Sequence, residues 1–436
     1  MMWRTGSLAL AALLSATPMS AQVARPPAPP ATRTMPATEA LVRRYVAENK
    51  TPGIAIAVGG PDWTSIHAAG RVAAEAGTPA VDGDTLWRVY SMTKPITGMA
   101  AMMLVEDGKL RLDQPIGDFI PAFRNMRVLT DPANSLNSRP ASRPITVRHL
   151  LTHTAGLGYS IVTTGPLRAK YERLGILPLA VNAQAETAMK RVRPKSLKDF
   201  ADRVATLPLI ADPGTKWSYS IGLDVMGRVI EVASGMSFEQ FLQTRMFGPL
   251  KMTSTFWSVP ASQKGRLVTN YALAGDNRVP LDPGATSVFL SPPDFPYGGA
   301  GLVMSARDYD RFLHMLQNGG TLDGRRVMKP ETVALGMSDL LPPGVTFGGV
   351  AGTTGGATGG AAAPKMGYGA GGSVYLESAP GAPGKGTYGW GGAAGTIAFV
   401  DPTHKVRGTV MVNYFPADRW PLRADAMGAL AADLRR

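Results

Sequence analysis

The sequence predicts an α+β fold in which one antiparallel sheet is built from both ends of the chain, around an inserted and mostly helical region. Two observations indicate this arrangement. Short apolar runs typical of buried strands occur at residues 53–58 near one end and at 396–400 and 408–414 near the other. Between them, roughly from residue 120 to 290, apolar residues recur mainly at helical spacing. We therefore expect the sheet to be flanked by N- and C-terminal helices.

The N-terminal part of the sequence predicts alternating helices and strands. An amphipathic helix begins near Thr38, and the strand at 53–58 ends at a glycine pair. Further strands are expected at 65–72 and 86–90, and the second of these runs directly into Ser91. A buried helix follows at 95–108, with Pro95 in its first turn.

The rest of the chain is helix-rich before strands return. Helices are expected at 145–151, 185–207, 221–247, 309–317 and 422–434, and a short strand at 302–304. The run from 348 to 360 contains only glycine, alanine, threonine and valine and predicts a loop. We assign residues 38–120 and 291–436 to a discontinuous α/β domain and residues 121–290 to a helical domain.

The N-terminus predicts export. Arg4 precedes a short apolar run at 8–14, and small residues follow up to Ala21, a pattern typical of a signal peptide at residues 1–21. That run is much shorter than the roughly 20 residues of a membrane span. Residues 22–37 are proline-rich and predict a leader to the folded part. We expect a periplasmic or secreted protein without a stable membrane span.

Composition excludes several classes of site. The 436 residues include no cysteine, so there is no disulfide, thiol nucleophile or cysteine-based zinc site. His149 and His153 have the spacing of a zinc motif, but Leu150 replaces its glutamate. The net charge of +13 is scattered, and the basic cluster at 190–198 lacks the aromatic residues of a single-strand binder. We expect no metal, cofactor or nucleic acid, and a monomer or small homo-oligomer.

The first candidate for chemistry is the Ser91-Met92-Thr93-Lys94 segment at the start of a predicted buried helix. Residues three apart on a helix share a face, so the hydroxyl of Ser91 and the amine of Lys94 lie together. Unpaired N–H groups at the helix start suit a developing oxyanion. The simpler alternative is a helix-capping serine beside an exposed lysine.

Two further segments complete the candidate site. Tyr219 stands at a junction between a loop and a helix, where a phenol beside a cation can act as a base, or can simply pack at a domain seam. The segment from Tyr388 to Thr396 is glycine-rich around Trp390, and the N–H of Ala393 is a candidate oxyanion donor. Its plainer interpretation is a glycine-rich β-turn.

In order and separation these three segments resemble the serine β-lactamase and penicillin-binding superfamily, and within its class C-like branch the family VIII carboxylesterases. The segments at 145–157, 246–255 and 298–307 support the resemblance. It implies a β-lactamase-like fold, Ser91 as the acylated nucleophile, Lys94 as its partner and Tyr219 as the base. Trp390, Gly391 and Gly392 occupy the strand position of the Lys-Thr-Gly motif, and Ala393 supplies the second oxyanion donor.

Two departures from the lactamase pattern bear on substrate. Ile221 replaces the asparagine of Tyr-x-Asn, and Trp390 replaces the lysine that pairs with the β-lactam carboxylate. An apolar wall in place of a cation favours a neutral substrate. We therefore expect a serine carboxylesterase that cleaves small short-chain esters. The alternatives are a β-lactamase or D-alanyl-D-alanine carboxypeptidase, and a non-catalytic cell-wall-binding protein.

Overall fold

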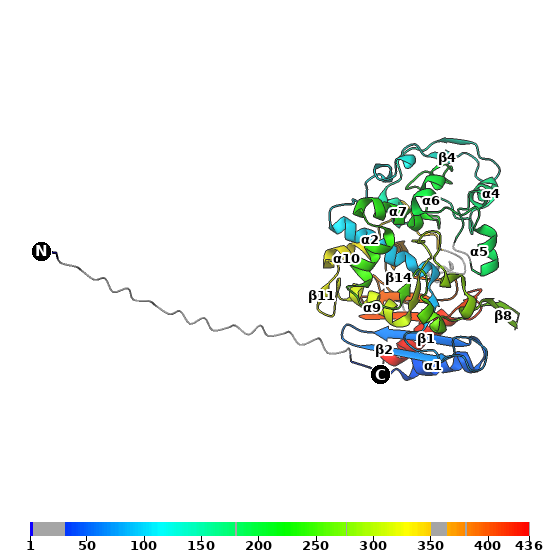
Figure 1. Ribbon diagram of the computed structural model, residues 1–436, viewed down its shortest axis with the longest axis vertical. Coiled ribbons are helices and arrows are strands. Elements are labelled where there is room, and N and C mark those ends of the chain that lie inside the picture. The colour runs from blue at the N-terminus through cyan, green and yellow to red at the C-terminus, as the bar shows by residue number, and fades with distance from the viewer. Residues whose placement is uncertain (3–30, 179–180, 276, 350–363, 380–381, 436) are drawn as a thin grey trace.

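The computed structural model describes residues 1–2, 31–178, 181–275, 277–349, 364–379 and 382–435. Apart from its first two residues, the predicted signal peptide lies outside the described residues, as do much of the predicted leader and most of the predicted loop at 348–360. In Figure 1 the N-terminal strands and α1 lie at one end of the molecule, α4 and α6 at the other, and α2 between them.

A seven-stranded sheet joins the two ends of the chain. Its order is β12-β13-β14-β15-β16-β1-β2, and every neighbouring pair is antiparallel. The strands are β1 (Gly53–Gly59), β2 (Thr64–Gly70), β12 (Met366–Tyr368), β13 (Ser373–Tyr375), β14 (Tyr388–Gly391), β15 (Ile397–Asp401) and β16 (Val406–Met411). The predicted α+β arrangement, with one sheet built from both ends of the chain, is confirmed, because β1 from the first segment pairs with β16 from the last.

Helices cover both faces of this sheet. The terminal helices α1 (Pro36–Ala47) and α11 (Leu422–Leu434) contact each other, and Leu41 and Leu430 share an apolar cluster with Ile56 and Val410 of the sheet. The Asp433 carboxylate accepts hydrogen bonds of 2.8 Å from N–H groups at the start of α1, which ties the C-terminal end of α11 to the N-terminal end of α1. On the other face, α9 (Ala306–Gln317) contacts β1 and β16.

The central region contains most of the remaining helices. They are α2 (Thr93–Glu106), α3 (Val147–Leu151), α4 (Gly165–Arg173), α5 (Ala183–Met189), α6 (Leu197–Ala205), α7 (Gly222–Ser234) and α8 (Phe238–Leu242), with α10 (Pro330–Gly336) nearer the C-terminus. The predictions of single helices at 185–207 and 221–247 are wrong. Ser196 and Ser237 each cap a new helix, accepting from the N–H groups of Asp199 and Gln240.

Part of the predicted helical centre forms strands. In the three-stranded sheet β3-β9-β6, β3 (Leu86–Arg88) and β6 (Thr255–Phe256) flank β9 (Val303–Ser305). In a second such sheet, β7 (Asn270–Ala274) lies between β8 (Asn277–Asp282) and β17 (Tyr414–Phe415). The short pairs are β4 (Arg127–Leu129) with β5 (Ser138–Pro140), and β10 (Thr321–Leu322) with β11 (Arg325–Arg326). The domain boundaries at 120 and 290 stay a prediction. No helix in the described ranges is both long and apolar enough to cross a membrane.

Candidate active site

Ser91 and Lys94 lie together where the chain enters α2. A single 3₁₀ turn, Tyr90–Met92, leads into the helix, and Tyr90 has the unusual φ of 42° just before the serine. Ser91 is partly exposed, whereas only 1% of Lys94 is. The Lys94 Nζ lies 3.2 Å from the Ser91 Oγ. The turn therefore presents the hydroxyl to solvent and keeps the amine behind it.

Tyr219 reaches the same hydroxyl from the loop before α7. Its phenol donates a 2.7 Å hydrogen bond to the Ser91 Oγ. The Lys94 Nζ lies 4.6 Å from the centroid of the Tyr219 ring, so the amine faces the phenol as well as the hydroxyl. The alcohol, the amine and the phenol that the sequence singled out thus converge at one point.

The end of β14 packs against the segment that precedes Ser91. A Cβ on Gly392 would lie 2.4 Å from the carbonyl oxygen of Val89, so only glycine permits this approach. Ala393 follows on an exposed turn. Within the described part of the chain, neither the N–H of Ser91 nor that of Ala393 has a hydrogen-bond acceptor. Two free donors near a nucleophile are what an oxyanion hole requires.

An aromatic cluster surrounds Tyr219. Trp390, buried in β14 beside Gly391, has its ring centroid 5.9 Å from that of Tyr219 and 5.3 Å from that of Tyr368. Trp217 stacks beside Tyr219 at 6.4 Å and meets Phe347 edge-on at 4.8 Å. This side of the site is therefore apolar and uncharged.

Ile221 is buried at the start of α7, in the same apolar cluster as Tyr219, and its role in substrate binding stays a prediction. Its N–H donates to the carbonyl of Gly158, and its carbonyl accepts from Asp224 and Val225. Among the described residues, none of its hydrogen bonds reaches Ser91. Its contacts hold the beginning of the helix.

Two residues that the sequence analysis missed support Lys94. The Lys94 Nζ donates a 2.7 Å hydrogen bond to the carbonyl of Gly299, and the N–H of Gly299 donates at 2.8 Å to the Asp224 carboxylate. The backbone of one residue, Gly299, therefore links a buried carboxylate to the amine. Burial raises the pKa of Asp224 to about 6, although the Lys94 charge acts in the opposite direction. The sequence offered one signal for Asp224, because it is a lone aspartate within the apolar run that follows Tyr219.

The two histidines of the rejected zinc motif are held by hydrogen bonds. The Nδ1 of His153 accepts from the Ser220 N–H at 3.2 Å and shares a 2.9 Å hydrogen bond with its hydroxyl. The Nδ1 of His149 accepts from the Thr146 N–H at 3.1 Å. Burial lowers the pKa of His149 to about 4 and that of His153 well below its usual range. In the ranges that the structure describes, no group of three histidine or acidic residues could hold a metal ion.

This arrangement can support acyl transfer. A hydroxyl is held between an amine and a phenol, and two free N–H groups lie on the segments beside it. No hydrogen bond joins a histidine to Ser91 in the described residues, so the geometry is not that of a serine–histidine pair.

Comparison with known proteins gives relatives over most of the chain. Protein Rv1367c of Mycobacterium tuberculosis is 34% identical over 368 residues, covering 82% of this chain and 84% of that protein. The lovastatin esterase of Penicillium rubens is 31% identical, covering 81% and 84%. The acyltransferase calJ of Penicillium decumbens is 30% identical, covering 74% and 75%.

A solved structure and a family model agree with these relatives. EstCE1, described as a hydrolase with promiscuous acyltransferase activity, superposes with a TM-score of 0.72 at 24% identity, covering 90% of this chain and 97% of that one. The family model described as Beta-lactamase matches residues 38–432. The chain therefore belongs to the beta-lactamase family of serine hydrolases, whose members include esterases and acyltransferases.

Proposed function

We propose that the protein is a serine carboxylesterase that cleaves short-chain esters of small alcohols through an acyl-enzyme on Ser91. The observation that carries the proposal is the convergence of Lys94 and Tyr219 on the Ser91 Oγ, at 3.2 and 2.7 Å. The lovastatin esterase among the relatives supports ester chemistry.

The proposed reaction has two halves. In the first, the Ser91 Oγ attacks the ester carbonyl while its proton passes to the phenol oxygen of Tyr219, which has given its own proton to Lys94. The tetrahedral oxyanion takes hydrogen bonds from the N–H groups of Ser91 and Ala393. The C–O bond to the alcohol then breaks, and the alcohol leaves with the proton held by the pair. In the second half, water attacks the acyl carbon and the same pair accepts a proton from that water. The bond between the acyl carbon and the Ser91 Oγ then breaks, the Oγ takes that proton from the pair, and a carboxylic acid is released.

The surroundings of the site favour a neutral ester over a β-lactam. Trp390 stands in the strand position where a β-lactamase has a cation, and the rings of Trp217 and Tyr368 lie on the same side. An anionic substrate would lose water there without gaining a charged partner. The alternatives of a β-lactamase and of a D-alanyl-D-alanine carboxypeptidase both act on anionic substrates and would need a cation at the position of Trp390.

A direct comparison of substrates tests the proposal. We expect p-nitrophenyl butyrate to be hydrolysed much faster than a chromogenic cephalosporin, and Ser91→Ala to abolish the ester activity. Ser262→Ala, at an exposed serine, is the matched control and should leave the activity unchanged. Faster cephalosporin turnover would favour the β-lactamase alternative. Absence of both activities in the folded protein would favour a non-catalytic cell-wall-binding protein.

Transfer of the acyl group to an alcohol is the second candidate, supported by the relative calJ. The acyl-enzyme is the same, but an acceptor alcohol replaces water. Product analysis in increasing concentrations of a primary alcohol distinguishes the two: an esterase releases mainly the free acid, whereas a transferase forms mainly the new ester.

We also propose that the protein acts after export, in the periplasm or outside the cell. The support is the charged, apolar and small-residue pattern of residues 1–21. Mass spectrometry of the protein from the culture medium or periplasm should show a mature N-terminus near residue 22. A full-length protein retained in the cytoplasm would contradict this.

A further inference from the structure

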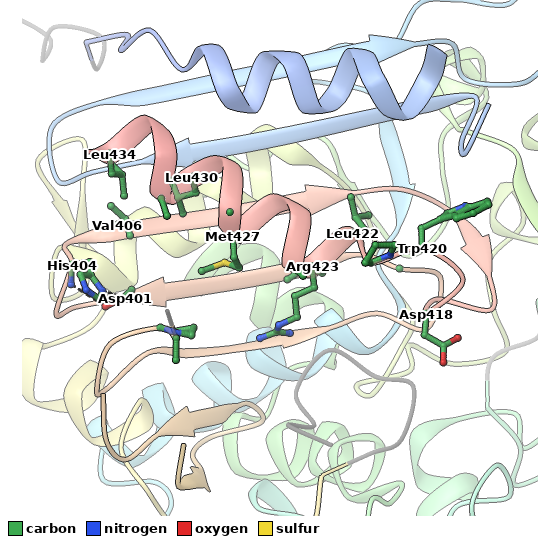
Figure 2. Close-up of a pocket in the computed structure, with 18 of the residues that line it drawn as sticks. Asp401, His404, Val406, Asp418, Trp420, Leu422, Arg423, Met427, Leu430 and Leu434 are labelled. Carbon is green, nitrogen blue, oxygen red and sulfur yellow. Dashed lines mark hydrogen bonds and ion pairs between the residues drawn. The ribbon is translucent and has the colours of Figure 1, made fainter. Parts of the chain in front are cut away.

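A groove of about 1010 Å³ lies along α11, and Ser91, Lys94 and Tyr219 are not among the residues that line it. Its size is at the upper end of the range of about 300–1,000 Å³ for small-molecule sites. Figure 2 shows Leu430, Leu434 and Met427 along the helix, Val406 on the strand beside it and Trp420 at one end. None of the residues that line the groove belongs to the proposed catalytic machinery.

The groove exists because α11 is covered along only part of its surface. Leu422 and Leu430 are buried against β15, β16 and α1, whereas Met427 and Leu434 are only partly buried. The side chains that border the groove are thus mostly apolar, and the helix flank they form has no covering element in the described part of the chain. An apolar flank of this extent fits a hydrocarbon chain.

One partly buried cation lies within this apolar lining. Arg423 projects from α11 over the strands (Figure 2), and its side chain has the Tyr375 phenol as hydrogen-bond partner. Burial lowers the pKa of Arg423, and no carboxylate pairs with it among the described residues. Arg423 is only partly exposed. A guanidinium that borders apolar surface and has no carboxylate partner can pair with an anionic ligand at this point.

Among the charged groups that line the groove, Arg423 is the one best placed to bind an anion. Asp401 is already occupied, because it accepts from the Nδ1 of His404 at 2.7 Å and from the N–H of Gly384 at 2.9 Å. Asp418 is exposed beside Trp420, at the end of the groove opposite Asp401 (Figure 2). Arg435 is a second, exposed cation.

We propose that this groove binds a fatty acid, with its carboxylate on Arg423 and its chain along Met427, Leu430 and Leu434. The charge and the apolar flank together select an amphipathic carboxylate over a neutral lipid. The site is separate from Ser91, so the inference does not depend on the proposed esterase activity.

Calorimetric titration with dodecanoate, below its micelle concentration, tests this on the Ser91→Ala protein, in which acyl transfer is blocked. We expect saturable binding that strengthens about two- to fourfold for each CH₂ from octanoate to dodecanoate. Arg423→Gln should weaken dodecanoate about tenfold and leave dodecan-1-ol nearly unchanged. Met427→Trp, which fills the groove, should weaken both. Arg326→Gln, at an exposed arginine of β11, is the matched control and should change neither.

The titration also has outcomes that overturn the proposal. Circular dichroism establishes first that each variant is folded. Absence of saturable binding to the folded parent protein, or binding that both Arg423→Gln and Met427→Trp leave unchanged, would place any fatty-acid site elsewhere. Equal weakening of dodecanoate and dodecan-1-ol by Arg423→Gln would remove the role of the cation. A concentration-dependent dimer that Met427→Trp abolishes, without dodecanoate binding, would show that a second copy covers the groove instead.

Discussion

The phenol oxygen of Tyr219 lies 2.7 Å from the Oγ of Ser91, although the two residues are 128 positions apart in the chain. The Lys94 Nζ, in the first turn of α2, lies 3.2 Å from the same Ser91 Oγ. In the proposed reaction these three groups pass one proton among them and therefore act as a unit. The losses in kcat caused by removing them one at a time should therefore not add.

The first prediction concerns this lack of additivity. Tyr219→Phe keeps the ring and removes the oxygen, and should lower kcat for p-nitrophenyl butyrate by about 10²–10⁴. Lys94→Ala should cost a similar factor, and the double variant little more than either single one. Steady-state kinetics on the four proteins measures this. Losses that multiply would show that the two residues act independently.

The second prediction concerns Gly392. A Cβ there would meet the carbonyl oxygen of Val89 at 2.4 Å, so Gly392→Ala must move β14 away from the segment that carries Ser91. We expect kcat to fall about tenfold or more, since losing one oxyanion donor costs about 10²–10³. Gly265→Ala is the control, because a Cβ at Gly265 meets nothing within 4 Å. If folded Gly392→Ala had an unchanged kcat, the turn at Gly392 would have no role in catalysis.

The pair of Ser91 and Lys94 could be predicted from sequence because helix geometry alone places residues three apart on one face. The sheet could be predicted because its strands are short apolar runs bounded by turns. Tyr219 and Ala393 could be named only as candidates beside plainer interpretations, and the resemblance alone connected them with Ser91, since nothing local does. Gly299 could not be found at all, because it contributes its backbone carbonyl and N–H, which no residue pattern marks.

The strands β6, β7 and β8 show a second limit of the sequence. β6 and β7 pair with β9 and β17, which lie far along the chain, and β8 pairs with the neighbouring β7. The apolar residues of such short segments do not define a period. The breaks after α5 and α7 depend on capping serines within an apparently continuous pattern.

The third prediction concerns pH. Because burial raises the pKa of Asp224 to about 6, the folded protein binds a proton there more readily than the unfolded chain does. This contribution to the free energy of unfolding therefore falls as pH rises from about 4 to 6, by roughly 3 kcal/mol in all. Asp224→Asn should lack that decrease. Urea unfolding of both proteins at pH 4.5 and 7 measures the difference, and equal changes in the two would contradict it.

The fourth prediction concerns substrate charge. Trp390→Lys introduces a cation at the strand position beside Tyr219, and should raise the ratio of kcat/KM for an anionic cephalosporin to that for the neutral ester about tenfold. Trp217→Lys, in the same aromatic cluster but outside that strand, is the matched control and should not raise the ratio. An equal rise of this ratio in both variants would mean that a positive charge anywhere in the cluster favours the anionic substrate, and that the position of Trp390 is not special.

The most direct measurement of the central claim is covalent labelling with a fluorophosphonate ester, followed by peptide mass mapping. A hydroxyl activated by an amine and a phenol should displace fluoride and gain the phosphonyl mass on the peptide that contains Ser91, and the folded Tyr219→Phe protein should react far more slowly. Labelling on a peptide without Ser91, or equal rates in the two proteins, would contradict the account.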